Sequence, residues 1–376
     1  MDEKVFSKYL KKCGDLPRFP KLAELRFAVV IPAFDELETL PRTLDDLAAQ
    51  KDCRPTAVIV VVNHPAGSDP NPSLRLLEYL QHREMPENLP LIPLYRPDTA
   101  DGVGEARKFG MDVFVRQCTA PSADFSWMWS LDADCRVDAD YLSCSQRTAE
   151  QLPPEYGGMI FQVRHQTGAT PELERAIRRY EHYLADYEAA LTRAGSPYNY
   201  TAVGSAFAVR VRDYIRSGGM KQKKAGEDFY FLQELRKCSR LKRLPEVVVH
   251  PSGRISLRVP FGTGRAVAKL LDGEDLPLTL PAAETALAAL LRLAAQKGVL
   301  CDGRLLIAQA ENLAAEFLRR ERFESIWAKV VANQPDDDAA QLAAFHRWFD
   351  ALKTRRFLNF VTERSSSDAS LGVDLK

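Results

Sequence analysis

The stretch FAVVIPAF at residues 27–34 decides the fold of this chain. It is an apolar run interrupted only by a proline, and such runs are typical of strands that a parallel sheet buries on both faces. The next segment, residues 35–50, has leucines at the spacing of an amphipathic helix, namely Leu37, Leu40, Leu44 and Leu47. A buried strand followed by an amphipathic helix is the repeating unit of a parallel α/β sheet.

The same alternation continues to about residue 134. Buried strands are predicted at AVIVVV (57–62), LIPLYR (91–96) and FSWMWSLDAD (125–134), and helices at SLRLLEYLQ (73–81) and GEARKFGMDVFVRQ (104–117). Strands that alternate with helices in this way predict an α/β fold with a doubly wound sheet and right-handed crossovers.

The rest of the chain has a different pattern. Strands are predicted at 201–210 and 246–250, a long helix at 171–193, and Ala- and Leu-rich helices at 282–297, 303–320 and 339–353. Beyond residue 266 no strand is predicted, and the tail SSSDASLGVDLK has the composition of a loose end. We therefore expect an N-terminal arm (1–26), an α/β domain (27–265) and a helical C-terminal subdomain (266–376).

Composition and charge exclude several classes of protein. The 376 residues include 51 Lys and Arg and 51 Asp and Glu, so no overall basic field attracts nucleic acid. Seven cysteines without a C-x-x-C pair form neither a disulfide framework nor a zinc site. The sequence has no signal-peptide core, and no apolar run reaches the ~18 residues of a transmembrane helix. We expect a cytoplasmic protein that could reach a membrane only from its surface.

The residues that follow the predicted strands are the first candidates for a site, because open α/β sheets bind ligands at that edge. Along the chain they are Pro32, Ala33, Phe34, Asp35 and Glu36, then Asn63, then Asp101, Gly102, Gly104 and Arg107, and finally Asp132 and Asp134.

Asp132 and Asp134, in SLDADC, are the sharpest of these candidates. Their i, i+2 spacing places both carboxylates on the same side of an extended chain. Such a pair suits Mg²⁺ or Mn²⁺ bound to the phosphates of a nucleotide. Two solvated turn aspartates would have the same spacing, so the motif alone does not decide between a metal site and a turn.

Four motifs in this order resemble glycosyltransferase family 2 over about residues 27–260. They are IPAFDELETL (31–40), the D-x-D segment, GSAFAVRVRDYIRSGGM (204–220) and AGEDFYFLQEL (225–235). The resemblance implies the GT-A fold, a Rossmann-like nucleotide-binding domain with a mixed sheet. It also implies transfer of a sugar from a UDP- or GDP-linked donor to the hydroxyl of an acceptor, such as a glycan or a lipid-linked sugar.

The resemblance assigns roles to individual residues. Its nucleotide-binding positions are Pro32, Ala33, Phe34, Glu36, Asn63, Gly104, Arg107 and Asp132, and its metal pair is Asp132 and Asp134. Asp228 matches the catalytic base of inverting members, with Glu227 beside it, and a carboxylate within ~3 Å of a hydroxyl can take its proton. Acidic residues also favour a helix start, which is the structural alternative for this pair. Asn63 stands where the family usually has an aspartate, and Asp35 where an asparagine is common, so the nucleobase stays open.

Residues after the strand at 246–250 complete the expected site. His250 stands where several GT-A enzymes have a third metal ligand, which Mn²⁺ accepts alongside carboxylates, although a lone histidine is more often structural. Arg254 and Arg258 are expected to bind the diphosphate from a closing loop, and a solvated basic loop would look the same.

Two other functions fit parts of the pattern. A sugar-phosphate nucleotidylyltransferase also has an α/β nucleotide domain, but its usual G-x-G-T-R opening does not follow the first strand here. A non-catalytic nucleotide-sugar sensor or scaffold of polysaccharide biosynthesis would not need Asp132, Asp134 and Asp228, and the chain has all three. We therefore expect a hexosyltransferase-type enzyme that uses Mn²⁺ or Mg²⁺ and inverts the sugar with Asp228 as base.

Overall fold

The computed structural model describes residues 1–19, 24–100, 102–222, 226–255, 263–276 and 281–371, the last six without their side chains. The chain divides into two compact units. One comprises Met1–Glu181 and Ala202–Asp275, and the other comprises His182–Thr201 and Leu276–Lys376. The second unit thus includes residues 182–201, which the sequence pattern alone places in the α/β domain.

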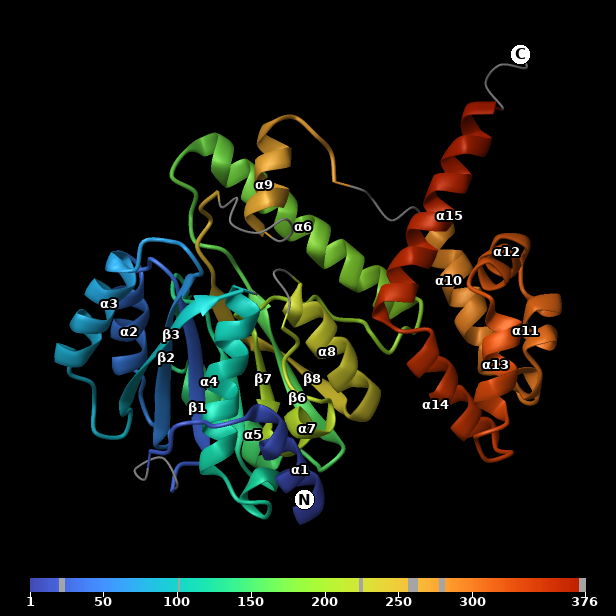
Figure 1. Ribbon diagram of the computed structural model, residues 1–376. Helices are drawn as coiled ribbons and strands as arrows, with labels where there is room; N and C mark the ends of the chain where they lie inside the picture. The colour runs from blue at the N-terminus through green and yellow to red at the C-terminus, as the bar shows by residue number, and fades with distance from the viewer. Residues whose placement is uncertain (20–23, 101, 223–225, 256–262, 277–280, 372–376) are drawn as a thin grey trace. The chain divides into compact units, whose positions relative to one another are not determined.

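An eight-stranded mixed sheet forms the centre of the described part of the first unit, with the order β3-β2-β1-β4-β7-β6-β8-β5 (Figure 1). β3, β2, β1 and β4 are parallel, whereas β7 pairs antiparallel with β4 and β6. The predicted doubly wound mixed sheet is therefore confirmed. The strands are β1 (Phe27–Ala33), β2 (Thr56–Pro65), β3 (Leu91–Thr99), β4 (Trp127–Ser130), β5 (Arg136–Val137), β6 (Tyr156–Val163), β7 (Phe207–Arg210) and β8 (Arg240–His250).

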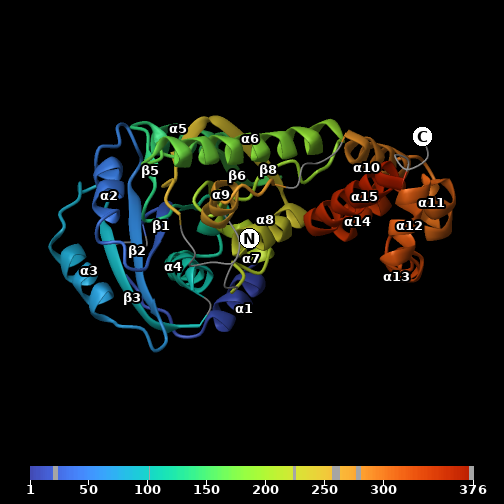
Figure 2. The ribbon, with the colours of Figure 1, turned by 90° about the horizontal axis from the view of Figure 1, so that it is seen from above.

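Helices cover both faces of the sheet (Figure 2). Val29 and Ile31 of β1 belong to the core on the face of α2 and α3, whereas Val30 faces α4. A Cβ added at Gly110 of α4 would lie 2.6 Å from Val30 Cγ1, so glycine allows this helix to approach the sheet closely. The helices of this unit are α2 (Leu40–Ala48), α3 (Asn71–His82), α4 (Val103–Gln117), η2 (Ser122–Asp124), α5 (Tyr141–Gln151), α7 (Val211–Arg216), α8 (Glu227–Cys238) and α9 (Thr263–Leu271).

The N-terminal segment contains a docked helix, α1 (Glu3–Cys13), where the sequence pattern predicts only an arm. Its Tyr9 hydroxyl donates a hydrogen bond to Asp112 Oδ1 of α4 at 2.7 Å, and the Tyr214 hydroxyl of α7 donates to the same oxygen at 2.9 Å. All three side chains are buried. The two phenol donors and the nearby Lys108 ammonium compensate the desolvation of the Asp112 carboxylate.

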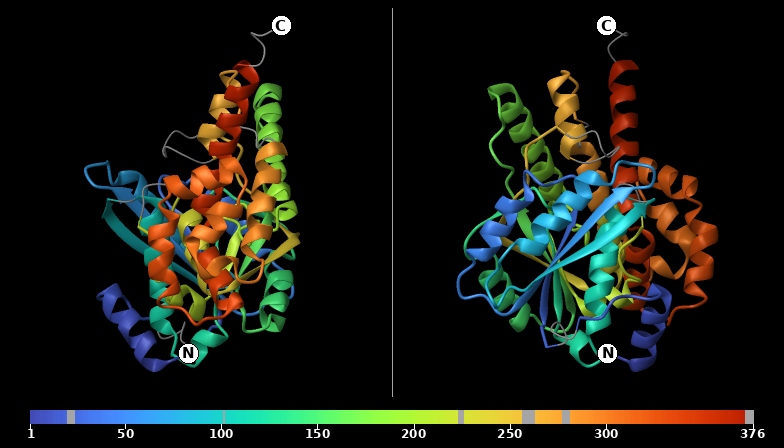
Figure 3. Two further views of the ribbon diagram at one scale, coloured as in Figure 1. Left: turned by 90° about the vertical axis from the view of Figure 1, so that its right-hand side faces the viewer. Right: turned by 60° about the vertical axis from the view of Figure 1, so that its left-hand side comes forward.

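The described part of the second unit consists of helices joined by turns and loops, without strands (Figure 3, left). Its helices are the C-terminal part of α6 (Pro171–Arg193), α10 (Pro281–Ala294), η3 (Val299–Cys301), α11 (Gly303–Gln309), α12 (Asn312–Arg320), α13 (Phe323–Val331), α14 (Asp338–Trp348) and α15 (Ala351–Leu371). Leu191 of α6 packs in one apolar core with Leu287, Phe317, Trp327 and Phe345.

Two expectations for this unit need correction. The predicted helix over 303–320 is divided into α11 and α12, because Ala310 and Glu311 have extended backbone conformations. The tail that the composition marks as loose continues α15 as far as Leu371. In the part of the chain that the structure describes, no helix is long and apolar enough to cross a membrane.

Candidate functional site

Carboxylate side chains from distant parts of the chain gather at the ends of the central strands of the first unit. They come from the segments after β1 and β4 and from the start of α8, and two arginines pair with them. The carboxylates belong to Glu36, Asp132, Asp134, Glu227 and Asp228, and the guanidinium groups to Arg107 and Arg254. The right-hand view in Figure 3 shows the sheet from which these segments extend.

Arg107 joins the D-x-D segment to the start of α8. Its Nη2 donates to Asp132 Oδ1 at 2.5 Å, and its Nη1 donates to Glu227 Oε1 at 2.7 Å. The arginine side chain is 1% exposed and that of Glu227 is 6% exposed, so this ion pair is shielded from water. The sequence predicts Arg107 as a nucleotide-binding residue, and the structure places both its terminal nitrogens on protein carboxylates.

Gly204 makes room for this guanidinium group. A Cβ added at Gly204 would lie 2.9 Å from Arg107 Nη2 and 3.2 Å from Nη1, closer than side chains normally approach. Its carbonyl oxygen also accepts a hydrogen bond from Ser130 Oγ at 2.6 Å, which ties the segment before β7 to the end of β4. Gly204 is the first residue of one of the four family motifs, but sequence reasoning gave it no role of its own.

Arg254, in the segment after β8, pairs with two carboxylates. Its Nη2 is hydrogen-bonded to Glu36 Oε1 and lies 3.1 Å from Asp134 Oδ2. Glu36 Oε2 in turn accepts a hydrogen bond from Thr39 Oγ1 at 2.5 Å. Arg254 thus connects the segment after β1 to the second aspartate of the D-x-D pair.

Burial and neighbouring negative charges perturb two of the acidic groups. Burial, followed by the charge of Asp132, raises the pKa of Asp134 to about 6, while Arg254 acts in the opposite direction. Burial, followed by the charge of Glu227, raises the pKa of Asp228 to about 7, against the stabilising charge of Arg107. Asp228 Oδ1 also accepts a hydrogen bond from the backbone N–H of Phe229 at 2.7 Å. Such perturbed groups at a strand edge are typical of functional sites.

His250 makes contacts of its own. Its Nδ1 lies 2.9 Å from the carbonyl oxygen of Arg164, and its Nε2 lies 3.3 Å from Asp138 Oδ1. Within the described residues, no three His, Cys, Asp or Glu side chains are grouped closely enough to hold a metal ion. The structure therefore does not assemble the triad of His250, Asp132 and Asp134 that the sequence suggests.

The other expected nucleotide-binding residues lie at the same strand ends. Pro32 and Ala33 are buried at the end of β1, Phe34 is half-buried, and Gly104 is buried in the first turn of α4. Asp35 has a φ of 54°, a left-handed conformation that aspartate and asparagine tolerate better than most residues. Asn63 is buried, and its Nδ2 donates to Thr99 Oγ1 at 3.3 Å. Arg258 lies outside the described residues.

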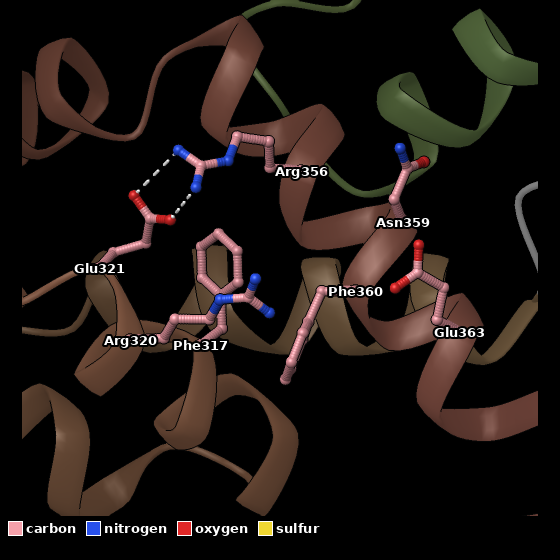
Figure 4. A pocket seen from close by; sticks show the side chains of 7 residues that line it. All are labelled: Phe317, Arg320, Glu321, Arg356, Asn359, Phe360 and Glu363. Atoms are coloured by element: carbon pink, nitrogen blue, oxygen red, sulfur yellow. Dashed lines mark hydrogen bonds and ion pairs between the residues drawn. The ribbon is translucent and has the colours of Figure 1, made fainter. Parts of the chain in front are cut away.

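The second unit has a cavity of about 190 Å³, which is lined by residues of the helical core and its surface (Figure 4). Arg356 pairs across it with Glu321 at 2.7 Å, which ties α15 to the residue that follows α12. Phe317 and Phe360 are 2% and 6% exposed, so their rings offer little surface to a ligand. The lining has no histidine, cysteine or aspartate, and we assign these contacts to the packing of the helical unit.

The fold is that of an α/β protein with an acidic cluster at its strand ends, and the sequence identifies its family. The family described as Glycosyl transferase family 2 matches residues 28–217, which is half of the chain. The chain therefore belongs to glycosyltransferase family 2, and it is a glycosyltransferase with the GT-A architecture. The predicted family, fold class and enzyme class are thereby confirmed. The matched segment includes Arg107, Asp132 and Asp134 and ends before Glu227.

Several solved structures are remotely similar to this chain. S. aureus TarS 1-349 in complex with UDP-GlcNAc is 14% identical, with a TM-score of 0.47, and the match covers 80% of this chain and 88% of that one. GalNAc-T7 with UDP, GalNAc and Mn²⁺ is 15% identical, with a TM-score of 0.39, and the match covers 65% of this chain and 48% of that one. No curated protein matches the chain.

Proposed function

We propose that this glycosyltransferase moves a sugar from a nucleoside-diphosphate sugar to an acceptor hydroxyl with inversion, and that Asp228 is the base. The observation that supports this most is the connection made by Arg107. It holds the D-x-D segment and the start of α8 together through two bonds of 2.5 and 2.7 Å. A donor site and a base site must be adjacent for direct displacement, and the two contacts of Arg107 support such an arrangement.

The charges of the site fit a divalent cation. Five carboxyl groups face two guanidinium groups among the described residues, so negative charge is in excess. The arginine contacts involve one oxygen of Asp132 and one oxygen of Asp134, and these side chains remain 35% and 18% exposed. Asp132 and Asp134 would therefore hold Mn²⁺ or Mg²⁺, whose hard oxygen preference they match. A cation bound there would neutralise the charge of the departing diphosphate.

The residues of the chain would then act as follows. The acceptor oxygen attacks the anomeric carbon while the bond from that carbon to the phosphate oxygen breaks. The nucleoside diphosphate leaves, and the acceptor proton moves to the Asp228 carboxylate. A base is most effective when its pKa lies near the working pH, and burial beside Glu227 raises the pKa of Asp228 to about 7. Arg107 positions Asp132 and Glu227 and stays in place throughout.

The test is a binding and turnover panel with UDP- and GDP-sugars, each with Mn²⁺, with Mg²⁺ and with EDTA. We expect one donor class to bind with a metal-dependent affinity, and we expect nucleoside diphosphate to be released when a glycan or a lipid-linked acceptor is added. Binding without any release across the acceptors would favour a nucleotide-sugar sensor instead. If EDTA leaves the affinity for the nucleotide-sugar unchanged, donor binding does not need a metal, and the metal would be removed from the proposal.

A further inference from the structure

The two arginines of the site differ in how firmly they are held. Arg107 comes from helix α4, is 1% exposed and donates to Asp132 and Glu227 through separate nitrogens. Arg254 comes from the segment after β8, is 38% exposed and uses a single nitrogen, Nη2, for both Glu36 and Asp134. Arg107 is thus enclosed by its partners, whereas more than a third of the Arg254 side chain is open to solvent.

Arg254 occupies the carboxylate that the proposed cation needs. Its Nη2 lies 3.1 Å from Asp134 Oδ2, and a divalent cation on the same carboxylate would repel the guanidinium group at this range. The two cations therefore compete for Asp134. A bound diphosphate changes the balance, because its oxygens offer Arg254 a new anionic partner that guanidinium groups bind well.

We propose that Arg254 is an exchangeable internal cation that holds Asp134 until a nucleoside diphosphate and a divalent metal arrive together. This inference rests on the proposed function of the site and adds a coupling between its two ligands. A metal that binds alone either meets the Arg254 charge on the same carboxylate or has to displace it, so it binds weakly. The diphosphate of the nucleotide binds the Arg254 guanidinium group, which leaves Asp134 free for the metal. The nucleotide therefore strengthens metal binding by more than the contact between metal and phosphate alone. By linkage the metal strengthens nucleotide binding by the same factor.

The variant Arg254→Gln tests the exchange with a readout that does not depend on turnover. Binding of Mn²⁺ is followed by the loss of the electron paramagnetic resonance signal of the free ion, alone and with UDP or GDP. Without nucleotide, we expect the variant to bind Mn²⁺ roughly tenfold more tightly than the wild type, within the usual range of coupling between sites. The factor by which nucleotide tightens Mn²⁺ binding should fall by a similar amount.

Arg136→Gln is the matched control, because it removes the same charge two residues from Asp134. Arg136 pairs with Asp46, with its Nε 2.5 Å from Oδ2. We expect its Mn²⁺ affinity to stay within about twofold of the wild type, since the Arg136 charge is paired with Asp46 and not with Asp134. An equal gain in both variants would show a general field effect and would overturn the exchange.

The outcomes separate this inference from the proposed function. Wild-type protein that binds no Mn²⁺ with either nucleotide would overturn the exchange and would remove the metal, but not the sugar transfer, from the proposed function. Wild-type protein that binds Mn²⁺ with nucleotide, together with an Arg254→Gln variant of unchanged Mn²⁺ affinity, would overturn the exchange alone. Arg254→Lys gives a second test, because lysine retains the charge but lacks the planar fork of donors. We expect its Mn²⁺ affinity without nucleotide to lie between those of the wild type and Arg254→Gln.

Discussion

Arg107 Nη1 donates to Glu227 Oε1 at 2.7 Å across 120 residues of sequence. This contact joins the first turns of α4 to the start of α8, so the residue beside the proposed base is fixed by a helix of the parallel half of the sheet. Since Arg107 also binds Asp132, one side chain contacts both the proposed metal pair and the residue beside the proposed base. The positions of Asp132 and Glu227 therefore depend on this buried network of ion pairs.

Arg107→Lys keeps the positive charge at this position but should disrupt the contacts to Asp132 and Glu227. A lysine ammonium is a point charge that cannot reproduce two directed bonds to separate carboxylates. Breaking a buried ion network typically costs about 3–5 kcal/mol, so we expect a clearly lower free energy of unfolding and a lower kcat. Chemical denaturation and steady-state kinetics measure these quantities. Wild-type values for both would show that the bridge is dispensable.

Gly204→Ala should have a related but smaller effect. The added Cβ would lie 2.9 Å from Arg107 Nη2, so the guanidinium group or the segment before β7 has to shift. Overpacking of this kind typically costs about 1–3 kcal/mol. We expect a loss of that size in denaturant unfolding and a reduced rate of transfer. If the variant keeps both values, the space around Arg107 is less tight than the structure indicates.

The sequence predicts the parallel half of the sheet well because a buried strand is a continuous apolar run. β1, β2 and β3 fall where those runs lie. β6 was not predicted, since it begins with Tyr156 followed by Gly157 and Gly158, which have low strand propensity. A Cβ at Gly157 would lie 2.5 Å from the Asp213 side chain, so packing rather than propensity requires glycine there.

Sequence motifs identify single candidate residues of the site, but they do not identify which side chains pair with them in the fold. Local motifs mark Asp132, Asp134 and Asp228 because their chemistry follows from short spacings. The pairing of Arg107 with Glu227 is a tertiary contact, and no local pattern encodes it. Helix α1 was missed for a similar reason, since only Phe6 and Tyr9 are buried among its residues, and the partners of Tyr9 lie on α4 and α7.

Asp134→Ala should abolish metal-dependent nucleotide binding and leave the fold intact. The substitution removes one of two carboxylates proposed to hold the cation. Burial raises the pKa of Asp134 to about 6, so we expect the fold to tolerate the loss of this charge. Calorimetric titration of nucleotide with and without Mn²⁺ measures the effect. Asp140→Ala, at an exposed aspartate, is the control and should bind as the wild type does. Unchanged Mn²⁺-dependent affinity in Asp134→Ala would refute the assignment.

Truncation after Asp275 should give an insoluble protein, as should truncation at residue 265. Leu191 and Ala194 belong to the core of the second unit, together with residues of α10 and later helices. Removal of those helices leaves these apolar side chains uncovered, and such surfaces favour aggregation. Solubility after expression and size-exclusion chromatography report the outcome, with removal of residues 372–376 as the control. A soluble and active protein ending at residue 275 would show that the helical unit is dispensable.

Asp228→Asn should separate catalysis from binding and should also change how stability depends on pH. Asparagine cannot accept the acceptor proton, so we expect donor and Mn²⁺ to bind normally while transfer falls by ~10²-fold or more. The pKa of Asp228 rises from 3.8 to about 7 on folding, so between these values the folded state holds more protons than the unfolded state, and stability falls as pH rises. The variant lacks this titration, and its melting temperature should exceed that of the wild type at pH 8 and approach it near pH 4.

The same ionisation sets the expected pH profile of the wild-type enzyme. Transfer needs the Asp228 carboxylate in its charged form, so kcat/KM should rise with pH and level off above about 7. Glu234→Gln, on the same helix and paired with Lys237, is the control and should leave both the profile and the rate unchanged. If Asp228→Asn transfers sugar at the full rate, Asp228 is not the base, and Glu227 is the next carboxylate to test. If the melting temperature of Asp228→Asn lies below that of the wild type at pH 8, the ionised carboxylate of Asp228 stabilises the folded state. The prediction that folding raises the pKa of Asp228 is then wrong.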